Sequence, residues 1–172
     1  MELARNRHEI LQFLDHNEIP YEYYEHERLF TIGECLRKPF ITDDVTICKN
    51  IFLSNRQQTR FYLLLLQPLT PFRTSVVSKA LGVSRLSFAP ETVMEEKLRL
   101  TSGSVSPLAL LFDQQHEITL CYESDVCNTS RIAFHPCDNA ATVIFSQQVF
   151  WERVIPLIGH DPVRLDLSSK ND

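Results

Sequence analysis

This chain of 172 residues lacks several features that would assign it to a protein class at once. No apolar run approaches the length of a membrane span, and the run over 61–66 is only strand-sized. The first seven residues contain no apolar segment of the kind that a secretory signal requires. We therefore expect a soluble, cytoplasmic protein that forms one domain with a core of its own.

Paired cysteines and metal-binding motifs are missing as well. The five cysteines include no Cys-x-x-Cys pair, and no group of histidines has metal-ligand spacing. Their odd number favours free thiols in a reducing compartment, and neither a metal nor another cofactor is expected. Cys137 lies two residues after His135, but residues so close in a turn seldom face each other, which argues against a thiol nucleophile there.

The signatures of several enzyme classes are absent too. No nucleophile elbow indicates a serine hydrolase, no paired carboxylates indicate acid–base catalysis, and no phosphate-loop lysine follows the glycine-containing segment at 103–107. The net charge of −5 argues against a non-specific nucleic-acid binder. Any contact with tRNA would depend on a local basic patch and would weaken with salt, and neither DNA nor a membrane is an expected partner.

What the sequence does contain is a succession of helical and strand patterns without a regular period. The patterns predict helices over 2–17, 31–37, 75–81, 90–98 and 146–158. They predict strands over 21–26, 46–54, 60–67, 84–88, 117–122, 131–135, 141–145 and 163–167. We expect an α+β fold: a single domain over 1–167 with a mixed, strongly curved, barrel-like sheet flanked by helices, and a polar tail over 168–172.

Lys49 has an unusual place in the strand predicted over 46–54. Strand alternation puts it on one face with Ile47, Ile51 and Leu53, which are all large aliphatics. An ammonium held among aliphatics costs free energy unless an anion or a carbonyl meets it. Lys49 is therefore either a lysine at a strand edge that reaches solvent, or a pocket lysine that binds a phosphate or polarises an ester carbonyl.

The segment Gly103-Ser104-Val105-Ser106-Pro107 lies between two apolar stretches. As structure alone it is a tight turn, in which Gly103 supplies unusual backbone angles and Pro107 begins a helix. As a site, its glycine and small serines would let backbone N–H and C=O groups approach a ligand closely. Such groups can hold an oxyanion or a substrate amine.

Two histidine motifs allow the same pair of interpretations. His135 begins a His-Pro turn, and Asn139, with Thr142 nearby, either stabilises this turn or borders a site. His160 follows Gly159 at the end of the helix predicted over 146–158, where the helix dipole alone favours a histidine.

Taken together, Lys49-Asn50, the 103–107 loop, the segment from His135 to Asn139 and the pair Gly159-His160 resemble the aminoacyl-tRNA editing domain of the bacterial prolyl-tRNA synthetase insertion family. The resemblance covers nearly the whole chain and is closest to free-standing Ala-tRNA(Pro) deacylases. It implies the prolyl-tRNA synthetase-associated domain fold. It also implies hydrolysis of alanine from mischarged tRNA(Pro), with water as the nucleophile and without a metal. A second sieve of this kind admits alanine and excludes proline.

The resemblance also implies roles for individual residues. Lys49 would anchor the terminal nucleotide or the ester carbonyl, backbone groups at 103–106 would hold the substrate amine and carbonyl, and His160 would shape the amino-acid pocket. The residues implied in the reaction are Lys49, Gly103, Ser104, Ser106 and His160. Those implied in substrate binding are Asn50, Val105, Pro107, His135, Asn139, Thr142 and Gly159. The implied partners are the alanine-charged acceptor end of tRNA(Pro) and prolyl-tRNA synthetase.

Three alternatives stay open. A related branch of the family removes cysteine from tRNA(Pro), and a few buried residues decide between the branches; the segments 23–26 and 30–31 resemble the alanine branch more. A non-catalytic module would keep the fold and bind tRNA or a synthetase without hydrolysis. A small-molecule esterase would act on simple esters without any tRNA.

Overall fold

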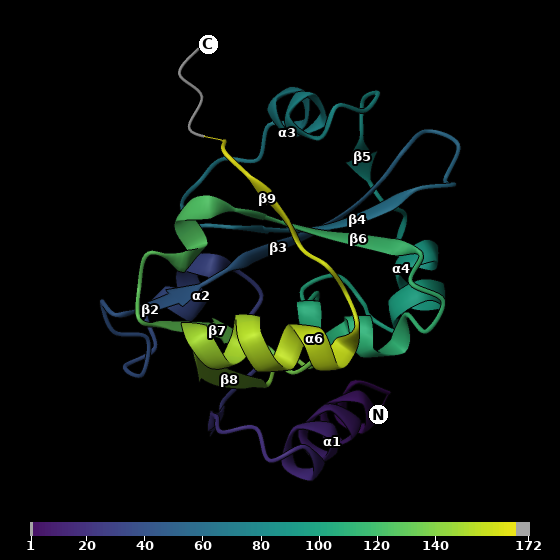
Figure 1. The fold of residues 1–172 in the computed structure, drawn as a ribbon. Helices are drawn as coiled ribbons and strands as arrows, with labels where there is room; N and C mark the ends of the chain where they lie inside the picture. Colours follow the sequence, from purple (N-terminus) through teal and green to yellow (C-terminus); the bar gives the residue numbers. More distant parts are fainter. Residues whose placement is uncertain (1, 168–172) are drawn as a thin grey trace.

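Two β-sheets organise residues 2–167, the part of the chain that this computed structural model describes. The predicted tail over 168–172 lies outside the described residues. The helical segments are α1 (Glu2–His16), α2 (Ile32–Leu36), α3 (Thr74–Leu81), α4 (Glu91–Leu98), η1 (Pro107–Phe112), η2 (Ser124–Cys127), α5 (Gln147–Val149), η3 (Phe150–Val154) and α6 (Ile155–Ile158) (Figure 1). The strands are β1 (Glu22–Glu25), β2 (Val45–Ile47), β3 (Lys49–Ser54), β4 (Phe61–Leu66), β5 (Ser87–Phe88), β6 (Ile118–Glu123), β7 (Arg131–Phe134), β8 (Ala141–Ser146) and β9 (Val163–Leu165). The predicted α+β class is confirmed.

The two sheets are both mixed, and both are open. The four-stranded sheet has the order β1-β8-β7-β2, and the five-stranded sheet has the order β5-β3-β4-β6-β9. In the larger sheet β3 pairs antiparallel with β4 and β5, whereas β6 runs parallel to β4 and β9. Among the described strands neither sheet closes on itself, so the expected barrel-like closure is not found.

The reason lies in the strand predicted over 46–54, which is divided between the two sheets. β2 pairs with β7 of the smaller sheet, whereas β3 pairs with β4 of the larger one. Buried Cys48 lies at the crossing point. Because one extended run supplies a strand to each sheet, the strands predicted from the sequence form two layers rather than one closed surface.

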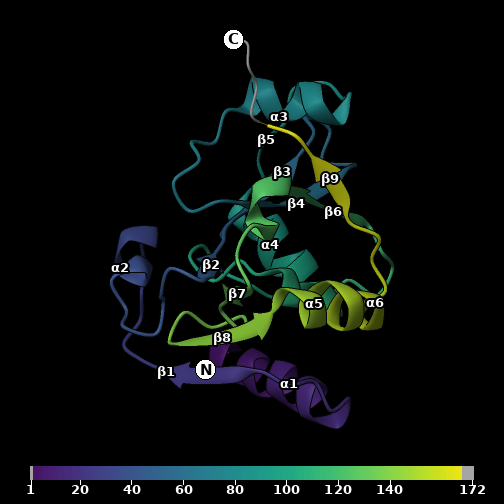
Figure 2. The same cartoon turned by 60° about the vertical axis from the view of Figure 1, so that its left-hand side comes forward.

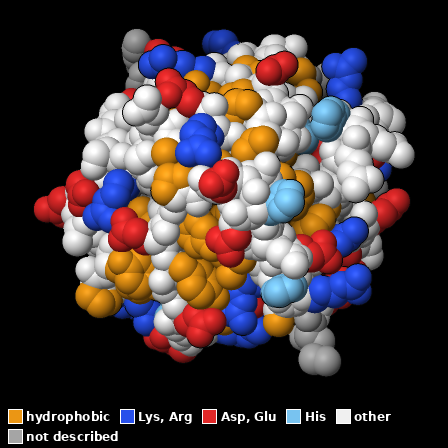
Figure 3. All heavy atoms as spheres, turned by 60° about the horizontal axis from the view of Figure 1, so that its bottom comes forward, with side chains coloured by type: hydrophobic (Ala, Val, Ile, Leu, Met, Phe, Trp, Pro, Cys, Tyr) orange, Lys and Arg blue, Asp and Glu red, His pale blue; other side chains and the backbone are white. Residues whose placement is uncertain are grey.

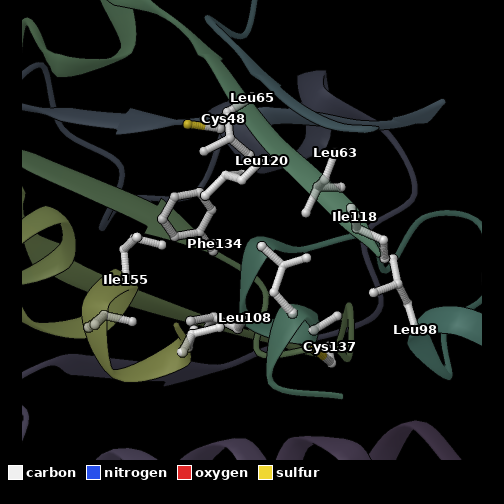
Figure 4. Packing of buried hydrophobic residues seen from close by; sticks show 14 of the residues in the cluster. Cys48, Leu63, Leu65, Leu98, Leu108, Ile118, Leu120, Phe134, Cys137 and Ile155 are labelled. Carbon is white, nitrogen blue, oxygen red and sulfur yellow. The ribbon is translucent and has the colours of Figure 1, made fainter. Parts of the chain in front are cut away.

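The core lies mainly between these layers. β4 is buried at every position, as its unbroken apolar run predicts. Leu63 and Leu65 belong to the cluster between the sheets, and Leu64 and Leu66 to a second cluster that includes Val77 of α3. Figure 4 shows side chains of the larger cluster packed together from both sheets and the helices between them. Figure 2 shows α3 over the outer side of the larger sheet and α1 beyond the smaller one.

The helix ends follow the sequence closely. The Thr31 hydroxyl accepts a hydrogen bond from the Glu34 amide while the Glu34 carboxylate accepts from the Thr31 amide, which is the predicted capping box. Gly82 and Gly159 end α3 and α6 in the left-handed conformation, with φ of 69° and 85°. The helix predicted over 146–158 is present from Gln147 and contains a π-helical turn, η3.

Candidate functional site

A pocket of about 230 Å³ opens where the crossing between the two sheets meets the 103–107 loop and the start of α2. Five residues predicted from the sequence line it together: Lys49, Asn50, Gly103, Val105 and His135. The other lining residues are Leu29, Phe30, Thr31, Ile32, Cys35, Ile47, Cys48 and Phe134. Segments that are far apart in the sequence thus meet at one small cavity with a largely apolar wall.

Lys49 begins β3 and is half-buried at the pocket. Its ammonium donates a hydrogen bond to the carbonyl oxygen of Thr70, in the loop between β4 and α3. An ammonium has three N–H donors, and no second acceptor for them is found among residues 2–167. Lys49 is therefore fixed by one carbonyl and keeps donors for a ligand, as expected for a pocket lysine rather than one that reaches freely into solvent.

Asn50 joins β3 to the 103–107 loop. Its Nδ2 donates to the carbonyl oxygen of Val105 over 3.0 Å, which holds the loop against the strand. Its Oδ1 and the hydroxyl of Ser104 are buried and have no hydrogen-bond partner within the described part of the chain. Unpaired buried polar groups cost about 1–3 kcal/mol each, so both atoms are suited to accept a donor from a bound molecule or water.

The loop itself divides into a pocket half and a structural half. Gly103 has φ of 88°, a left-handed conformation that favours glycine, and it lines the pocket together with Val105. Ser106 is fully buried, and its hydroxyl accepts from the Leu108 amide, which caps η1. Pro107 occupies the first turn of η1, as predicted. Ser104, Ser106 and Pro107 are not among the pocket-lining residues, and Ser106 and Pro107 instead fix the direction of the loop.

His135 is buried beside the pocket and is held in one orientation. Its Nδ1 donates to the carbonyl oxygen of Ala141 over 2.8 Å, and its Nε2 lies 3.7 Å from the sulfur of Cys35. Burial lowers the pKa of His135 and raises the pKa of the Cys35 thiol. The pair is therefore a neutral imidazole beside a neutral thiol, not a thiolate–imidazolium nucleophile.

Asn139 and Thr142 lie behind the pocket rather than on its wall. Asn139 exchanges hydrogen bonds with Leu29, from Nδ2 to the Leu29 carbonyl over 2.9 Å and from the Leu29 amide to the Asn139 carbonyl over 3.1 Å. Arg28 also donates to the Asn139 side chain, and the Thr142 hydroxyl pairs with His26 over 2.8 Å. Both residues thus secure the segment 26–30, which supplies part of the pocket rim.

Gly159 and His160 are not brought to this pocket. His160 is buried, and its Nε2 lies 3.0 Å from Oδ2 of Asp113, the residue that follows η1. The His116 ring packs edge-on against it, with centroids 4.8 Å apart. The sequence placed the Gly-His pair correctly at the end of a helix, but the fold packs that helix end against the far end of η1.

Eight pocket-lining residues were not among the predicted site residues, and Cys35 and Phe30 are two of them. Phe30 is 70% exposed although it lines the pocket, and its amide donates to the Glu34 carboxylate over 2.7 Å. The capping box at Thr31 is the sequence signal that could have identified it, because Phe30 precedes the N-cap of α2 and its backbone is fixed there.

The rest of the described chain adds four findings. No three His, Cys, Asp or Glu side chains within residues 2–167 gather as a metal-binding group. All five cysteines are free. On the face around α1, acidic and basic side chains are interspersed around an apolar area (Figure 3). Of the helices described here, none is both long and apolar enough to cross a bilayer.

Comparison with known proteins gives a consistent family. Residues 26–150 match the family model of the aminoacyl-tRNA editing domain. The chain is 32% identical over 139 residues to "Prolyl-tRNA editing protein ProX" of Acetoanaerobium sticklandii, covering 81% of this chain and 84% of that protein. It is 32% identical over 165 residues to "Prolyl-tRNA synthetase associated domain-containing protein 1" of Mus musculus, covering 93% and 95%.

The fold is also similar to solved structures. A crystal structure described as a candidate trans-editing enzyme for prolyl-tRNA synthetase matches with a TM-score of 0.68 at 12% identity, covering 94% of this chain and 96% of that one. The hypothetical protein APE2540 matches with a TM-score of 0.70 at 12% identity, covering 91% and 97%. At these identities the likeness concerns the fold alone.

Proposed function

Because this chain belongs to the aminoacyl-tRNA editing domain family, we propose that it is a trans-acting deacylase that hydrolyses alanine from mischarged Ala-tRNA(Pro). One observation carries the proposal: a half-buried ammonium with spare donors, Lys49, shares a small pocket with the Gly103–Val105 backbone. The names of the curated relatives support tRNA(Pro) as the tRNA. We further propose that the protein acts in the cytoplasm, with prolyl-tRNA synthetase as a candidate partner.

The proposed reaction needs positioning and charge stabilisation rather than a protein nucleophile. Water adds to the ester carbonyl carbon, the negative charge collects on the carbonyl oxygen, and the ester C–O bond then breaks. The ribose oxygen takes a proton as it leaves, and free alanine and tRNA result. Lys49 N–H groups and the backbone N–H groups of Gly103 and Val105 would stabilise the oxyanion, an effect that amounts to several kcal/mol in preorganised sites. Asn50 lines the pocket and its Oδ1 lacks a partner in the described chain, so it is the candidate to accept from the substrate amine.

The terminal nucleotide of the substrate would rest on the pocket rim. Phe30 presents an exposed aromatic ring there, and single-stranded nucleic acid is commonly bound by stacking of bases on aromatic side chains. Ser106, Pro107, Asn139, Thr142, Gly159 and His160 would then act by holding the loop, the rim and η1 in place.

The apolar part of the pocket wall supports alanine as the amino acid. Ile32, Ile47 and Phe134 give the pocket an apolar wall, and the total volume must hold part of the terminal ribose as well as the amino acid. A second sieve works by admitting a smaller side chain than the cognate one. The Cys35–His135 pair adds polar atoms to this wall, and it is the feature that favours cysteine as the second candidate substrate.

Side-by-side deacylation of tRNA(Pro) charged with alanine, cysteine or proline tests the proposal. We expect release of alanine with a kcat/KM at least about tenfold above that for cysteine, and no release of proline. The rate should fall as salt rises, because tRNA binding releases counterions. A preference for cysteine would show that the mischarged amino acid is cysteine rather than alanine, while ester hydrolysis would remain the reaction. If the protein binds tRNA but releases no amino acid, the non-catalytic module is the correct function. If it hydrolyses only simple esters, it is a small-molecule esterase.

A further inference from the structure

The loop between β4 and α3, residues 67–73, is held in its fixed position by hydrogen bonds to a buried carboxylate at the end of β6. Glu123, the last residue of β6, is 6% exposed. Its Oε1 accepts from the Gln67 amide over 2.9 Å, and its Oε2 accepts from the Thr70 hydroxyl over 3.3 Å. The Thr70 carbonyl in turn accepts from the Lys49 ammonium. One carboxylate therefore fixes both ends of the turn that holds the pocket lysine.

Strand register explains why a loop is needed between the two charged groups. Lys49 lies opposite Leu66 of β4, and Leu65 lies opposite Tyr122 of β6. Because β4 and β6 are parallel, the following residues, Leu66 and Glu123, are neighbours at the ends of these two strands. Lys49 and Glu123 are thus separated by two strand spacings, about 10 Å between their backbones. The 67–73 loop spans this edge, and Thr70 presents its hydroxyl to the carboxylate and its carbonyl to the ammonium.

The Lys49 ammonium needs to be fixed because a lysine side chain is flexible. Its four-carbon stem is flexible, and immobilising such a side chain costs up to about 2 kcal/mol of rotamer entropy. A single carbonyl acceptor selects among these rotamers only if the carbonyl stays in place. The loop has no helix or strand of its own, and Leu69 within it is exposed. Its N-terminal part is tethered by the Glu123 carboxylate and by the Gln67 side chain, which donates to the Asp125 carbonyl over 2.5 Å, whereas Phe72 in its C-terminal part packs against Phe88.

We propose that Glu123 is a positioning residue for the reaction: through Thr70 it holds the Lys49 ammonium at the site where the oxyanion forms. The proposal rests on the proposed function of Lys49. Glu123 is not a catalytic residue, because it is not on the pocket wall. Its effect should fall on kcat rather than on KM, since a displaced ammonium loses contact with the transition state while the rest of the pocket still binds tRNA.

The test compares Glu123→Ala with Glu123→Gln. We expect Glu123→Ala to lower kcat about 10- to 100-fold, the effect of a displacement of about 1 Å, with KM changed less than about threefold. Glu123→Gln keeps an oxygen acceptor for the Gln67 amide and should restore most of the rate. In a Lys49→Ala background, Glu123→Ala should change the residual rate less than about twofold, because the two residues act as one unit. A fall of equal size in both backgrounds would overturn the proposal.

Asn55 supplies a matched control at the opposite end of the same β3–β4 hairpin. Its Oδ1 accepts from the Thr59 and Arg60 amides over 2.8 and 3.1 Å, so it also holds a loop through backbone N–H groups. Asn55→Ala should lower the melting temperature while kcat stays within about twofold of wild type. If Asn55→Ala and Glu123→Ala lower kcat equally, the effect is general loosening of the hairpin and the positioning role is wrong.

A second readout does not depend on activity. NMR relaxation of the Lys49 CεH₂ group should report greater mobility in Glu123→Ala than in wild type, with no change in Asn55→Ala. This readout separates the proposed deacylase function from the proposed tether of Lys49 by Glu123. If wild type is inactive but Lys49 becomes more mobile in Glu123→Ala, the proposed function is wrong and the tether is supported. A Lys49 of unchanged mobility in Glu123→Ala would overturn the tether, whatever the enzyme hydrolyses.

Discussion

The two ends of η1 carry the two motifs that stand out most in the sequence, and they are built in opposite ways. At the start of η1, Gly103 and Val105 of the 103–107 loop line a cavity together with Lys49, which has spare donors, and Asn50, whose Oδ1 has no partner within the described chain. At its far end, Asp113 accepts from two backbone amides and lies against His160, and this pair is buried. His160 Nδ1 also has no partner within the described chain, so an unpaired polar atom alone does not distinguish the two ends. The difference is that such an atom belongs to a pocket-lining residue at the start of η1, whereas at the far end the Asp113 carboxylate has its acceptors occupied and joins two elements.

The comparison predicts that the start of η1 controls the rate and the far end controls stability. The largest effect should come from Lys49→Ala, because it removes the proposed oxyanion donor from the pocket. We expect kcat/KM for Ala-tRNA(Pro) to fall about 100- to 1,000-fold. Circular dichroism should show the same spectrum and a melting temperature within a few degrees of wild type. If Lys49→Ala retains activity, the reaction does not take place in this pocket.

At the far end, Asp113→Ala should act mainly on folding. It leaves the amides of Glu117 and Ile118 and the ring of His160 without their acceptor in a buried place. We expect the free energy of unfolding to drop by about 2–4 kcal/mol, measured by urea denaturation. The kcat of the remaining folded protein should fall far less than in Lys49→Ala. A loss of rate as large as that of Lys49→Ala, with stability kept, would make the far end part of the active site.

Phe30→Ala should give a smaller effect, confined to binding. Loss of one base–aromatic stack is worth about 1–3 kcal/mol, so KM should rise about 5- to 150-fold with kcat little changed. Phe30→Trp should return KM to near its wild-type value. Phe88 is the matched control, because it is 64% exposed but packs against Phe72 with centroids 5.2 Å apart, away from the pocket wall. Equal effects of Phe30→Ala and Phe88→Ala would exclude stacking at the rim.

The smallest predicted effect is a change in pH dependence at His135. Its pKa is lowered in the folded protein by burial, so below an ordinary value of 6.5 the unfolded chain takes up the proton first. The stability contribution of the neutral ring is therefore complete above about pH 6.5 and is lost as pH falls toward the lowered pKa. His135→Asn, which can still donate to the Ala141 carbonyl, should give a flatter fall of unfolding free energy between pH 7 and 5. An unchanged slope would mean that His135 is not neutral in the folded state.

The site was predictable to the extent that local chemistry distinguishes it. A lysine amid aliphatics and a Gly-to-Pro loop are local anomalies, and both reached the pocket wall. Cys35 and Phe30 carry no such anomaly, since an apolar helix and a residue before an N-cap are ordinary features. His160 is the opposite case: Gly159-His160 is conspicuous in the sequence, yet its neighbour Asp113 is 47 positions away and only packing brings them together.

The sequence by itself determined the elements of this protein, because helix caps, apolar alternation and turn residues act over a few neighbours: the Thr31 capping box and the buried run of β4 follow from them. Only the tertiary structure decided that the run through Cys48 divides between two sheets, and that the Thr70 carbonyl meets Lys49. Those outcomes depend on pairings between strands and loops distant in the chain, and no local pattern records which distant backbone group will be the partner.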